Sequence, residues 1–205
     1  SGAVGTGGFN TTNYNISYSP NTLTISQRPI TITASAKSKV YGEADPALTY
    51  TPQANTTNAG LVGSDTFTGA LTRASGENVG TYAIGQGTLA NGNYSITYTS
   101  ANLTISQRPI TITADAQSAM YGNGLALGTT AYTKTATSTG VGLASGDAIS
   151  SVTLQYSGSA TVSSTLAAGT YSSGIVASGA VGTGGFNTTN YNISYANGTL
   201  TITGE

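Results

Sequence analysis

The chain has 205 residues, only 6% of them charged, a net charge of −1, and neither histidine nor cysteine. Without those two side chains the segment lacks the usual ligands of zinc, haem and iron–sulfur centres and the usual imidazole and thiol catalysts, so we expect no metal, no cofactor and no enzymatic activity. Its six basic residues give no electrostatic footprint for nucleic acid or an anionic membrane, and no apolar run approaches the roughly 20 residues that membrane insertion requires.

The sequence repeats itself on two scales. The first eighteen residues, SGAVGTGGFNTTNYNISY, recur at 178–195, and the string LTISQRPITITA occurs at 23–34 and again at 103–114. The offsets between the copies, 177 and 80 residues, indicate modules that alternate between about 80 and about 97 residues. Self-similarity at such a period is typical of tandem arrays, so we expect the chain to be part of a longer array.

The first segment predicts a β-hairpin at Asn13–Ser26. Apolar residues alternate with polar ones in NYNISY, and after a turn the alternation resumes at Leu23 and Ile25. The same pattern recurs at 93–106 and 190–203. Threonine, isoleucine and tyrosine favour strands, and scattered glycine opposes long helices. We therefore expect residues 1–27 to be the closing strands of a preceding long module.

The hydrophobic pattern switches from odd to even positions across Gln27–Pro29. Leu23 and Ile25 lie on one side of the switch, and Ile30 and Ile32 on the other. One strand facing one core cannot change parity, so the chain must pass from one core to another at this point. Proline suits such a boundary because it removes a ladder donor and keeps the residue before it extended. The same string at 107–109 predicts a short module at 28–107 and a long module at 108–205, stiffly joined.

Several further features align between the two modules. Both have a Tyr-Gly pair, a Gly-Leu-x-x-x-Asp turn and a Gly-Thr-Tyr string, which lie at 41–42, 60–65 and 80–82 in the first module and at 121–122, 142–147 and 169–171 in the second. Short strands at regular spacing predict an all-β fold of tandem immunoglobulin-like antiparallel β-sandwich modules joined end to end. The late tyrosine is similar to the tyrosine corner of such sandwiches. The extra residues of the long module are expected between Gly122 and Tyr156.

The core of the short module is predicted from its apolar positions. We expect it to contain Ile30, Ile32, Tyr41, Leu48, Phe67, Leu71, Tyr82, Tyr94, Ile96, Leu103 and Ile105. A module of this size buries only about 60–65% of its unfolded surface, so contacts with neighbouring modules should add to its stability.

These ordered strings resemble a known family. The pattern ITITA…VYG…DPALTY…LVGSDTFTGAL…GENVGTYAIGQGTL…NYSITY…LTI, from Ile30 to Ile105, resembles the MBG-type repeat of very large bacterial surface and secreted proteins. The segment Ile110–Ile202 resembles the companion YDG domain, although Asn123 follows its Tyr-Gly pair and no aspartate lies within that pair. The resemblance implies a filamentous-haemagglutinin-like adhesin or a related extracellular fibre whose stalk such repeats form. It implies no catalytic residue.

A few polar residues allow a specific chemical role as well as an ordinary structural one. Glu43 and Asp45, with Asp65, supply oxygen ligands that suit calcium, and the first two could form the carboxylate pair of a glycosidase, but solvated turn residues are the favoured interpretation. Lys37 or Lys39 could form an isopeptide crosslink with an asparagine, although the second module has Gln117 and Ala119 at those positions. Asp65 and Asp147 are expected to cap turns through their own backbone.

The tyrosines and asparagines leave a glycan role open. Core packing is favoured over sugar stacking for the tyrosines that share the apolar face of their strands, which are Tyr14, Tyr18, Tyr94, Tyr98, Tyr191 and Tyr195. Acceptor sequons for N-glycosylation begin at Asn10, Asn15, Asn55, Asn93, Asn102, Asn187, Asn192 and Asn197. In a chain so rich in asparagine, serine and threonine, many of these triplets arise by chance.

The favoured hypothesis is a structural stalk of a secreted or cell-surface adhesin or fibre, which supports cell adhesion or a biofilm matrix. The alternative is a module that itself binds a glycan or a host protein, and a third is an accessory domain of a secreted enzyme. The expected partners are neighbouring identical modules or chains in a fibre, with glycan as a further possibility. Strands to complete the segment Ser1–Gln27 would come from upstream chain or from a neighbouring chain.

Overall fold

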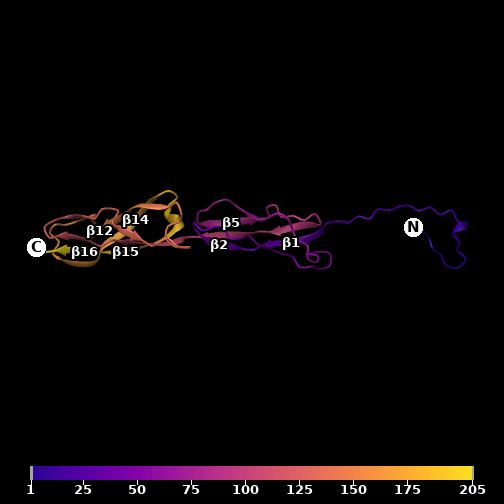
Figure 1. Cartoon of the computed structure of the whole chain (residues 1–205), viewed down its shortest axis with the longest axis horizontal. Helices are drawn as coiled ribbons and strands as arrows, with labels where there is room; N and C mark the ends of the chain where they lie inside the picture. Colours follow the sequence, from indigo (N-terminus) through magenta and orange to yellow (C-terminus); the bar gives the residue numbers. More distant parts are fainter. Residues whose placement is uncertain (1, 205) are drawn as a thin grey trace.

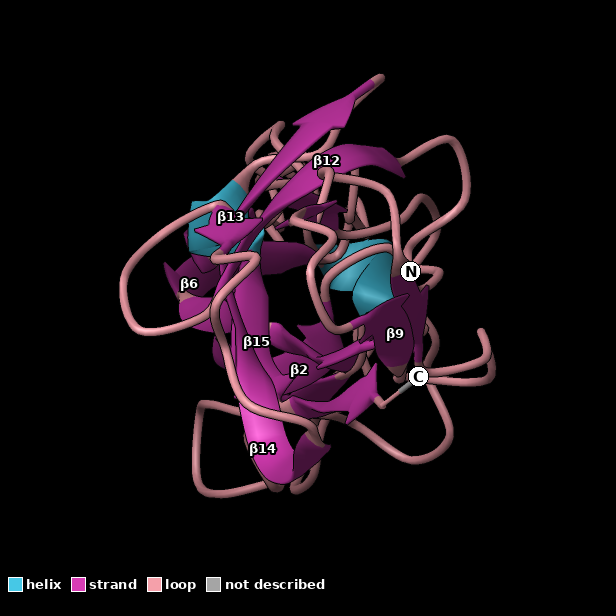
Figure 2. Ribbon diagram, turned by 90° about the vertical axis from the view of Figure 1, so that its left-hand side faces the viewer, coloured by secondary structure: helices cyan, strands magenta, loops and turns pink. Residues whose placement is uncertain are grey.

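The computed structural model describes residues 2–204. Ser1, which begins the predicted segment 1–27, and Glu205, which ends the predicted module 108–205, lie outside the described residues. Two β-rich modules follow one another along a common axis, and an extended N-terminal segment leads into the first (Figure 1). In the end-on view the strands of the two modules overlie one another, so the pair has the cross-section of a single module (Figure 2). The molecule is therefore all-β and elongated.

The first module has two sheets, ordered β3-β1-β6 and β2-β7-β5-β4. Its strands are β1 (Arg28–Ala34), β2 (Lys37–Val40), β3 (Tyr50–Pro52), β4 (Thr72–Arg73), β5 (Gly80–Gly85), β6 (Tyr94–Thr99) and β7 (Ala101–Ser106). The central strand β1 pairs in parallel with β6, and β2 pairs in parallel with β7, whereas the other pairs are antiparallel. Each sheet is therefore mixed.

The second module repeats this plan with longer elements. Its strands are β8 (Arg108–Ala114), β9 (Gln117–Met120), β10 (Leu125–Ala126), β11 (Tyr132–Lys134), β12 (Ala148–Gln155), β13 (Thr161–Val162), β14 (Gly169–Thr183), β15 (Tyr191–Ala196) and β16 (Gly198–Thr203). The sheets are β11-β8-β15, β12-β14-β16-β9 and the small pair β10-β13. The parallel pairs β8–β15 and β9–β16 correspond to β1–β6 and β2–β7.

The predicted antiparallel sandwich and its hairpins need correction. β6 and β7 are separated only by Ser100, and β15 and β16 only by Asn197, yet in each case the two strands lie in different sheets. A single residue is too short for the usual hairpin turn, so the chain crosses from one sheet to the other. The buried side chains switch from even positions, as at Tyr94, to odd positions, as at Leu103 and Ile105, at the same point. The alternation indicated the strands correctly but not their partners.

One feature of immunoglobulin-like sandwiches is nevertheless present. The Tyr82 hydroxyl donates to the Asn78 carbonyl at 2.7 Å, and the Tyr171 hydroxyl donates to the Ala167 carbonyl at 2.8 Å. Each is the short upstream contact of a tyrosine corner, as the Gly-Thr-Tyr strings predicted. Because the strand pairing is mixed, this contact is a local device for holding the turn before the strand and does not define an immunoglobulin fold.

The extra length of the second module lies only partly where the sequence placed it. β12, with eight residues, falls within the predicted interval between Gly122 and Tyr156, and it takes the place of the two-residue β4. β14, with fifteen residues, lies beyond that interval and takes the place of the six-residue β5. The two long strands pair with each other through irregular register, so the insertion is one extended ribbon.

The N-terminal segment shows what an identical sequence does without a partner. Its 3-10 helix η1 (Thr11–Asn13) is capped by Asn10, as η2 (Thr188–Asn190) in the second module is capped by Asn187. Between residues 2 and 27, however, the structure describes no strand, so the predicted hairpin at Asn13–Ser26 is absent. The cap needs only local hydrogen bonds, whereas a strand needs a sheet beside it. That this segment completes a preceding module stays a prediction.

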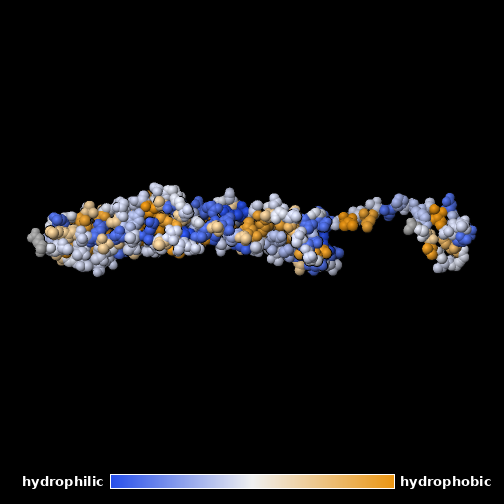
Figure 3. Space-filling model, viewed as in Figure 1, coloured by the Kyte–Doolittle hydropathy of each residue, from blue (hydrophilic) through white to orange (hydrophobic). Residues whose placement is uncertain are grey.

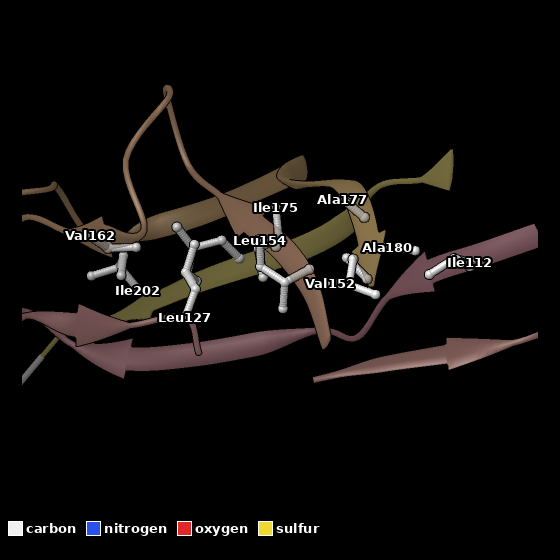
Figure 4. Close-up of a cluster of buried hydrophobic side chains, with 11 residues drawn as sticks. Ile112, Leu127, Val152, Leu154, Val162, Ile175, Ala177, Ala180 and Ile202 are labelled. Carbon is white, nitrogen blue, oxygen red and sulfur yellow. The ribbon is translucent and has the colours of Figure 1, made fainter. Parts of the chain in front are cut away.

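Each module has its own apolar core. The core of the second module contains Ile112, Leu154, Ile175 and Ile202, drawn from both of its large sheets (Figure 4). In the first module Leu48, Phe67, Tyr82 and Ile96 pack against the core at partial burial, and the other predicted residues are buried. Two of them, Tyr41 and Ile105, belong to a separate buried cluster and not to this core. By contrast, apolar surface is exposed along the stretch that leads into the first module (Figure 3).

The repeat supplies a matched test of core packing. Leu200 is fully buried, whereas Leu23, in the same string of the N-terminal segment, is 86% exposed. Leu200→Ala should lower the free energy of unfolding of the second module by about 2–5 kcal/mol, because it removes buried methyl groups and leaves a cavity. Leu23→Ala should change it by less than about 0.5 kcal/mol. Urea denaturation of both variants measures the difference, and equal losses would contradict the described core.

Candidate functional site: the junction between the modules

The chain passes between the modules at Gln107. β7 belongs to the sheet of the first module and β8 to that of the second, and the buried residues change from odd to even positions between them. Leu103 lies in the first core and Ile112 in the second. Ile105 and Ile110 instead belong to a third buried cluster. That cluster also contains Tyr41, Leu143, Ala144 and Tyr191, so the two modules share a small core of their own.

Arg108 is the central polar group of this junction. Its side chain is almost fully buried, and its Nε donates to the Gly142 carbonyl at 2.9 Å while Nη2 donates to two further carbonyls of the same turn. Nη1 points the other way, into the first module, where it donates to the Tyr41 carbonyl at 3.2 Å and to Glu43 Oε1 at 2.6 Å. One planar guanidinium therefore ties both modules together, which a lysine could not do.

Glu43 completes this contact from the side of the first module. Its Oε1 also accepts a hydrogen bond from the backbone N–H of Gly140 at 2.8 Å, so it binds two groups of the second module at once. The Gly140 N–H, and then the Arg108 guanidinium, hold the pKa of Glu43 below its ordinary value of 4.5. The carboxylate is therefore charged at neutral pH, and the contact is a charge-assisted one.

A second contact joins two tyrosines through one carboxylate. Asp147 Oδ2 accepts from the Tyr191 hydroxyl at 2.5 Å and from the Tyr41 hydroxyl of the first module at 3.2 Å. The two rings meet edge to face, with centroids 5.5 Å apart. Burial and the neighbouring charge of Asp147 raise the pKa of both phenols. Asp147 thus accepts from tyrosines of both modules. Its backbone N–H closes its own turn on the Ala144 carbonyl at 3.2 Å, while its carboxylate is used across the junction.

A third contact uses amide side chains. Asn190, 1% exposed, accepts from the Val79 N–H through Oδ1 at 2.9 Å and donates through Nδ2 to Asn78 Oδ1 at 2.9 Å. Nearby, Gln107 Nε2 donates to the Thr189 carbonyl at 3.2 Å. Among residues 2–204 every buried side-chain nitrogen and oxygen has a hydrogen-bond partner. The polar groups that the junction buries are therefore satisfied.

Gly42 marks the point of closest approach. Its φ angle is +79°, and a Cβ built on it would lie 2.5 Å from the Cβ of Ala144 in the second module. A real side chain would force the two modules apart. The Tyr-Gly pair that the sequence analysis noted therefore has two functions here, since the tyrosine binds Asp147 and the glycine permits the contact.

A charge cluster in the first module holds the loops that make these contacts. Lys39 Nζ lies 2.6 Å from Asp45 and 2.5 Å from Glu77, and the Arg73 guanidinium pairs with both carboxylates and lies over the ring of Tyr82. Asp45 follows the loop of Tyr41 to Glu43, and Glu77 precedes Asn78. The cluster therefore fixes both junction loops.

The electrostatics of this cluster oppose an isopeptide bond at Lys39. Hydrogen bonds from Arg73 and then Lys39 lower the pKa of Asp45 to about 2. Burial alone would lower the pKa of Lys39, but Asp45 and Glu77 outweigh it and the pKa is raised. Amide formation needs an uncharged amine, and Lys39 is held in its charged form. Its partners are carboxylates, not the asparagine that the sequence interpretation required.

The acidic residues considered as a calcium site do not come together. Glu43 faces Arg108 at the junction, Asp45 faces Lys39 and Arg73, and Asp65 accepts from Tyr94 at the other end of the module at 2.6 Å. Within residues 2–204 no group of three or more acidic residues could hold a metal ion. The two carboxylates of the suggested glycosidase pair, Glu43 and Asp45, form salt bridges with arginine or lysine side chains instead. Like Asp147, Asp65 closes its turn through its backbone N–H, which donates to the Val62 carbonyl at 3.1 Å, while its carboxylate accepts from a tyrosine.

The tyrosines divide according to the module that surrounds them. Tyr94 and Tyr191 are buried, Tyr98 is partly buried with its hydroxyl on the Ile84 carbonyl, and Tyr195 is 36% exposed. The expected core packing is confirmed for Tyr94 and Tyr191 and in part for Tyr98, whereas Tyr195 is exposed and packs against no core cluster of the described residues. Tyr14 and Tyr18, in the N-terminal segment, are 59% and 57% exposed. The expected core packing of Tyr14 and Tyr18 is therefore not observed, because the sheet predicted for them is absent.

The junction defines a class of protein, a tandem array of β modules with ordered contacts between its members. A family model described as the MBG domain (YGX type) matches residues 30–104 and 110–201, so the chain belongs to that family and carries two of its repeats. The match confirms the resemblance of the first module to the MBG repeat. The second module, expected to resemble a YDG domain, matches the same MBG model instead. In this chain the Tyr-Gly-X triplets are Tyr41-Gly42-Glu43, at the junction, and Tyr121-Gly122-Asn123.

MBG domain repeats are typical of bacterial surface proteins, and no catalytic family is assigned to the chain. No curated protein and no solved structure matches the chain. Within residues 2–204, no helix combines the length and apolar character needed to span a membrane.

Gly42 and Gly122 provide a matched test of the junction. Both have positive φ, +79° and +90°, so alanine costs roughly 1–2 kcal/mol of backbone strain at either position. Only at Gly42 would the added Cβ also collide with the next module, since nothing lies within 4 Å of a Cβ at Gly122. Gly42→Ala should therefore lose the mutual stabilisation of the modules and Gly122→Ala should keep it. Urea denaturation monitored by NMR signals of each module measures this, and equal effects would contradict the contact.

The junction should also respond to pH in two windows. The pKa of Glu43 is lowered from 4.5, so its contribution is complete above that pH and is lost as the pH falls through the folded-state pKa. The pKa values of Tyr41 and Tyr191 are raised from 10, so their contribution is complete below pH 10 and is lost at higher pH. Thermal unfolding across this range should show a plateau between the two windows. Glu43→Gln should flatten part of the acid limb, and an unchanged acid limb would contradict the role of Glu43.

Proposed function

We propose that the chain is a stalk or spacer segment of a repetitive extracellular bacterial adhesin or fibre, which supports cell adhesion or a biofilm matrix. The observation that carries the proposal is the junction itself, where side chains of both modules are buried together. Membership of a family typical of bacterial surface proteins supports the location. A spacer has to hold its neighbours at a fixed distance and orientation and needs no catalytic site, and the described contacts serve that purpose.

The geometry of the junction explains how the module pair would resist bending. Its contacts arise from three places, which are the Tyr41–Glu43 loop, the Asn78–Val79 segment and the connecting residue Gln107. Bending in any direction would stretch at least one hydrogen bond and expose part of the shared apolar cluster. Leaving a buried polar group without its partner costs about 1–3 kcal/mol, so several such contacts favour one relative orientation.

The binding-module alternative makes a separate prediction and stays untested. It requires the intact chain to bind a glycan or host protein, and a glycan array probes the first possibility directly. An array signal that depends on the exposed rings of Tyr14 and Tyr18 would support it. A stalk predicts no such signal from these repeats, because the tip domain of the full protein would carry the recognition.

Distance measurements test the spacer proposal. The chain contains no cysteine, so Thr97→Cys on β6 and Ser194→Cys on β15 place one spin label on an exposed residue of each module. A stiff junction should give a narrow distribution of label-to-label distances by double electron–electron resonance. Gly42→Ala in the same background should broaden it, because the close contact is lost.

Small-angle scattering gives an independent outcome. A compact chain of this length would have a radius of gyration of about 17 Å. The end-to-end arrangement predicts a clearly larger value and a pair-distance distribution skewed to long distances (Figure 1). A globular scattering curve, or a broad label distribution in the unaltered chain, would remove the basis of the proposal.

A further inference from the structure

The N-terminal end of the first module carries the same hydrogen-bonded framework that the second module presents at the junction. Arg28 Nε donates to the Gly60 carbonyl at 2.8 Å, as Arg108 does to Gly142. Gln27 Nε2 donates to the Gly92 carbonyl at 3.1 Å, as Gln107 does to Thr189. The connecting string is thus already seated on the first module in the manner of the junction.

The tyrosine–aspartate contact is duplicated as well. Tyr94 donates to Asp65 Oδ2 at 2.6 Å and accepts from the Val62 N–H at 3.0 Å. In the second module Tyr191 makes the corresponding contacts with Asp147 and Ala144, and there the Asp147 carboxylate receives Tyr41 as a further donor. Within residues 2–204, the Asp65 carboxylate accepts from Tyr94 and from no second tyrosine.

Burial shows that this end of the first module is an open version of the same surface. Val62 is 44% exposed, whereas its counterpart Ala144 is 6% exposed. Asn93 is exposed, whereas its counterpart Asn190 is buried. A cavity of about 300 Å³ lies here, and Arg28, Val62, Asp65, Asn93 and Tyr94 contribute to its walls. The cavity lies where the tyrosine of a preceding module would enter.

The other half of the junction is present, unused, at the far end of the second module. Tyr121-Gly122-Asn123 takes the place of Tyr41-Gly42-Glu43, and Tyr121 is 49% exposed where Tyr41 is buried. Gly122 has the same positive φ as Gly42, with open space around it. The loop is tied back to its own module through the Gly122 N–H, which donates to the Ser164 carbonyl at 3.1 Å.

We propose that the N-terminal end of the first module binds the C-terminal end of another long module of this kind. In that interface the Tyr121 hydroxyl donates to Asp65, Gly122 lies against Val62, and the Asn123 side-chain oxygen accepts from Arg28 Nη1. The occupant follows from the chain itself, because the residues that lead into Arg28 repeat the sequence of β14 to β15 of the long module. The inference rests on the proposed stalk function and specifies its second type of junction.

This second junction differs chemically from the first. Asn123 replaces the carboxylate of Glu43, so Arg28 meets a neutral amide oxygen and the ion pair is missing. Val62 replaces Ala144 and adds apolar surface in return. Ala167 replaces Asn78, which removes the amide pair, although the Ala168 N–H remains to donate to Asn93. The long-to-short junction is thus less polar than the short-to-long one.

A fused head-to-tail dimer, whose first copy ends at Ile202 and whose second copy begins at Ser26, regenerates this junction. Ile202 of the first copy is joined to Ser26 of the second, because Ile202 and Ile25 occupy the same position of the repeated string. Spin labels at Ser194→Cys in the first copy and Thr97→Cys in the second then report on the new junction. We expect a narrow distance distribution, as for the junction within one chain.

Two substitutions in the first copy identify the contact residues. Gly122→Ala should abolish the narrow distribution by pushing against Val62, and Tyr121→Phe should broaden it by removing the bond to Asp65. In the single chain both should leave the distances between its own modules unchanged, which also shows that the variants fold. Asn123→Glu should restore a charged contact with Arg28 and raise the thermal midpoint of the dimer.

The outcomes separate this inference from the proposed function. A narrow distribution that is lost with Gly122→Ala supports the interface. A broad distribution across the new junction, or one insensitive to Tyr121 and Gly122, overturns it while the stalk proposal stands, provided that the modules within one chain remain rigidly spaced. A broad distribution within the single chain would overturn the stalk proposal itself.

Discussion

The buried guanidinium of Arg108 is the interaction on which the arrangement of the two modules depends. Its Nε and Nη2 are held by carbonyls of its own module, so Nη1 can only point across the junction toward Tyr41 and Glu43. The guanidinium end of the pair lies out of water, with 3% of the Arg108 side chain exposed, whereas 32% of the Glu43 side chain is exposed. A chain with 6% charged residues thus places one of its few cations where it determines the relative orientation of two modules.

The N-terminal segment shows how far local sequence alone determines structure. The residues from 2 to 18 repeat those from 179 to 195, and both copies form the asparagine-capped 3-10 helix. Only the second copy forms strands, because β8 and β12 lie beside it. Ile25 is accordingly 88% exposed, while Ile202 in the same string is 3% exposed. Strand formation is a property of the module and not of the string.

This difference explains what the sequence could and could not predict. The alternation identified the strands and the core, and the parity switch marked the place where the chain leaves one sheet for another. The same switch occurs within the first module, between Tyr98 and Leu103. There the sequence predicts a hairpin that the structure does not have, because periodicity gives the face of a strand and not its partner. The sequence indicated Arg108 only as part of a module boundary and Asp147 only as a turn residue. Their contacts join residues 65 and 106 positions apart, which no local pattern reveals.

The two modules also differ in the surfaces they offer, and this difference bears on their order. The short module ends in Glu43 and in loops tied by Lys39 and Arg73. The long module has Ala119 in place of Lys39, and backbone hydrogen bonds to Thr203, Ser164 and Met120 hold its corresponding loop. The carboxylate fits the long module well, because Gly140 offers a backbone N–H beside Arg108. Each end of a module is therefore shaped for one kind of neighbour. With the proposed second junction, an alternating array would combine one junction with an ion pair between its modules and one without it in every repeat, so that acid would loosen every second joint before the others.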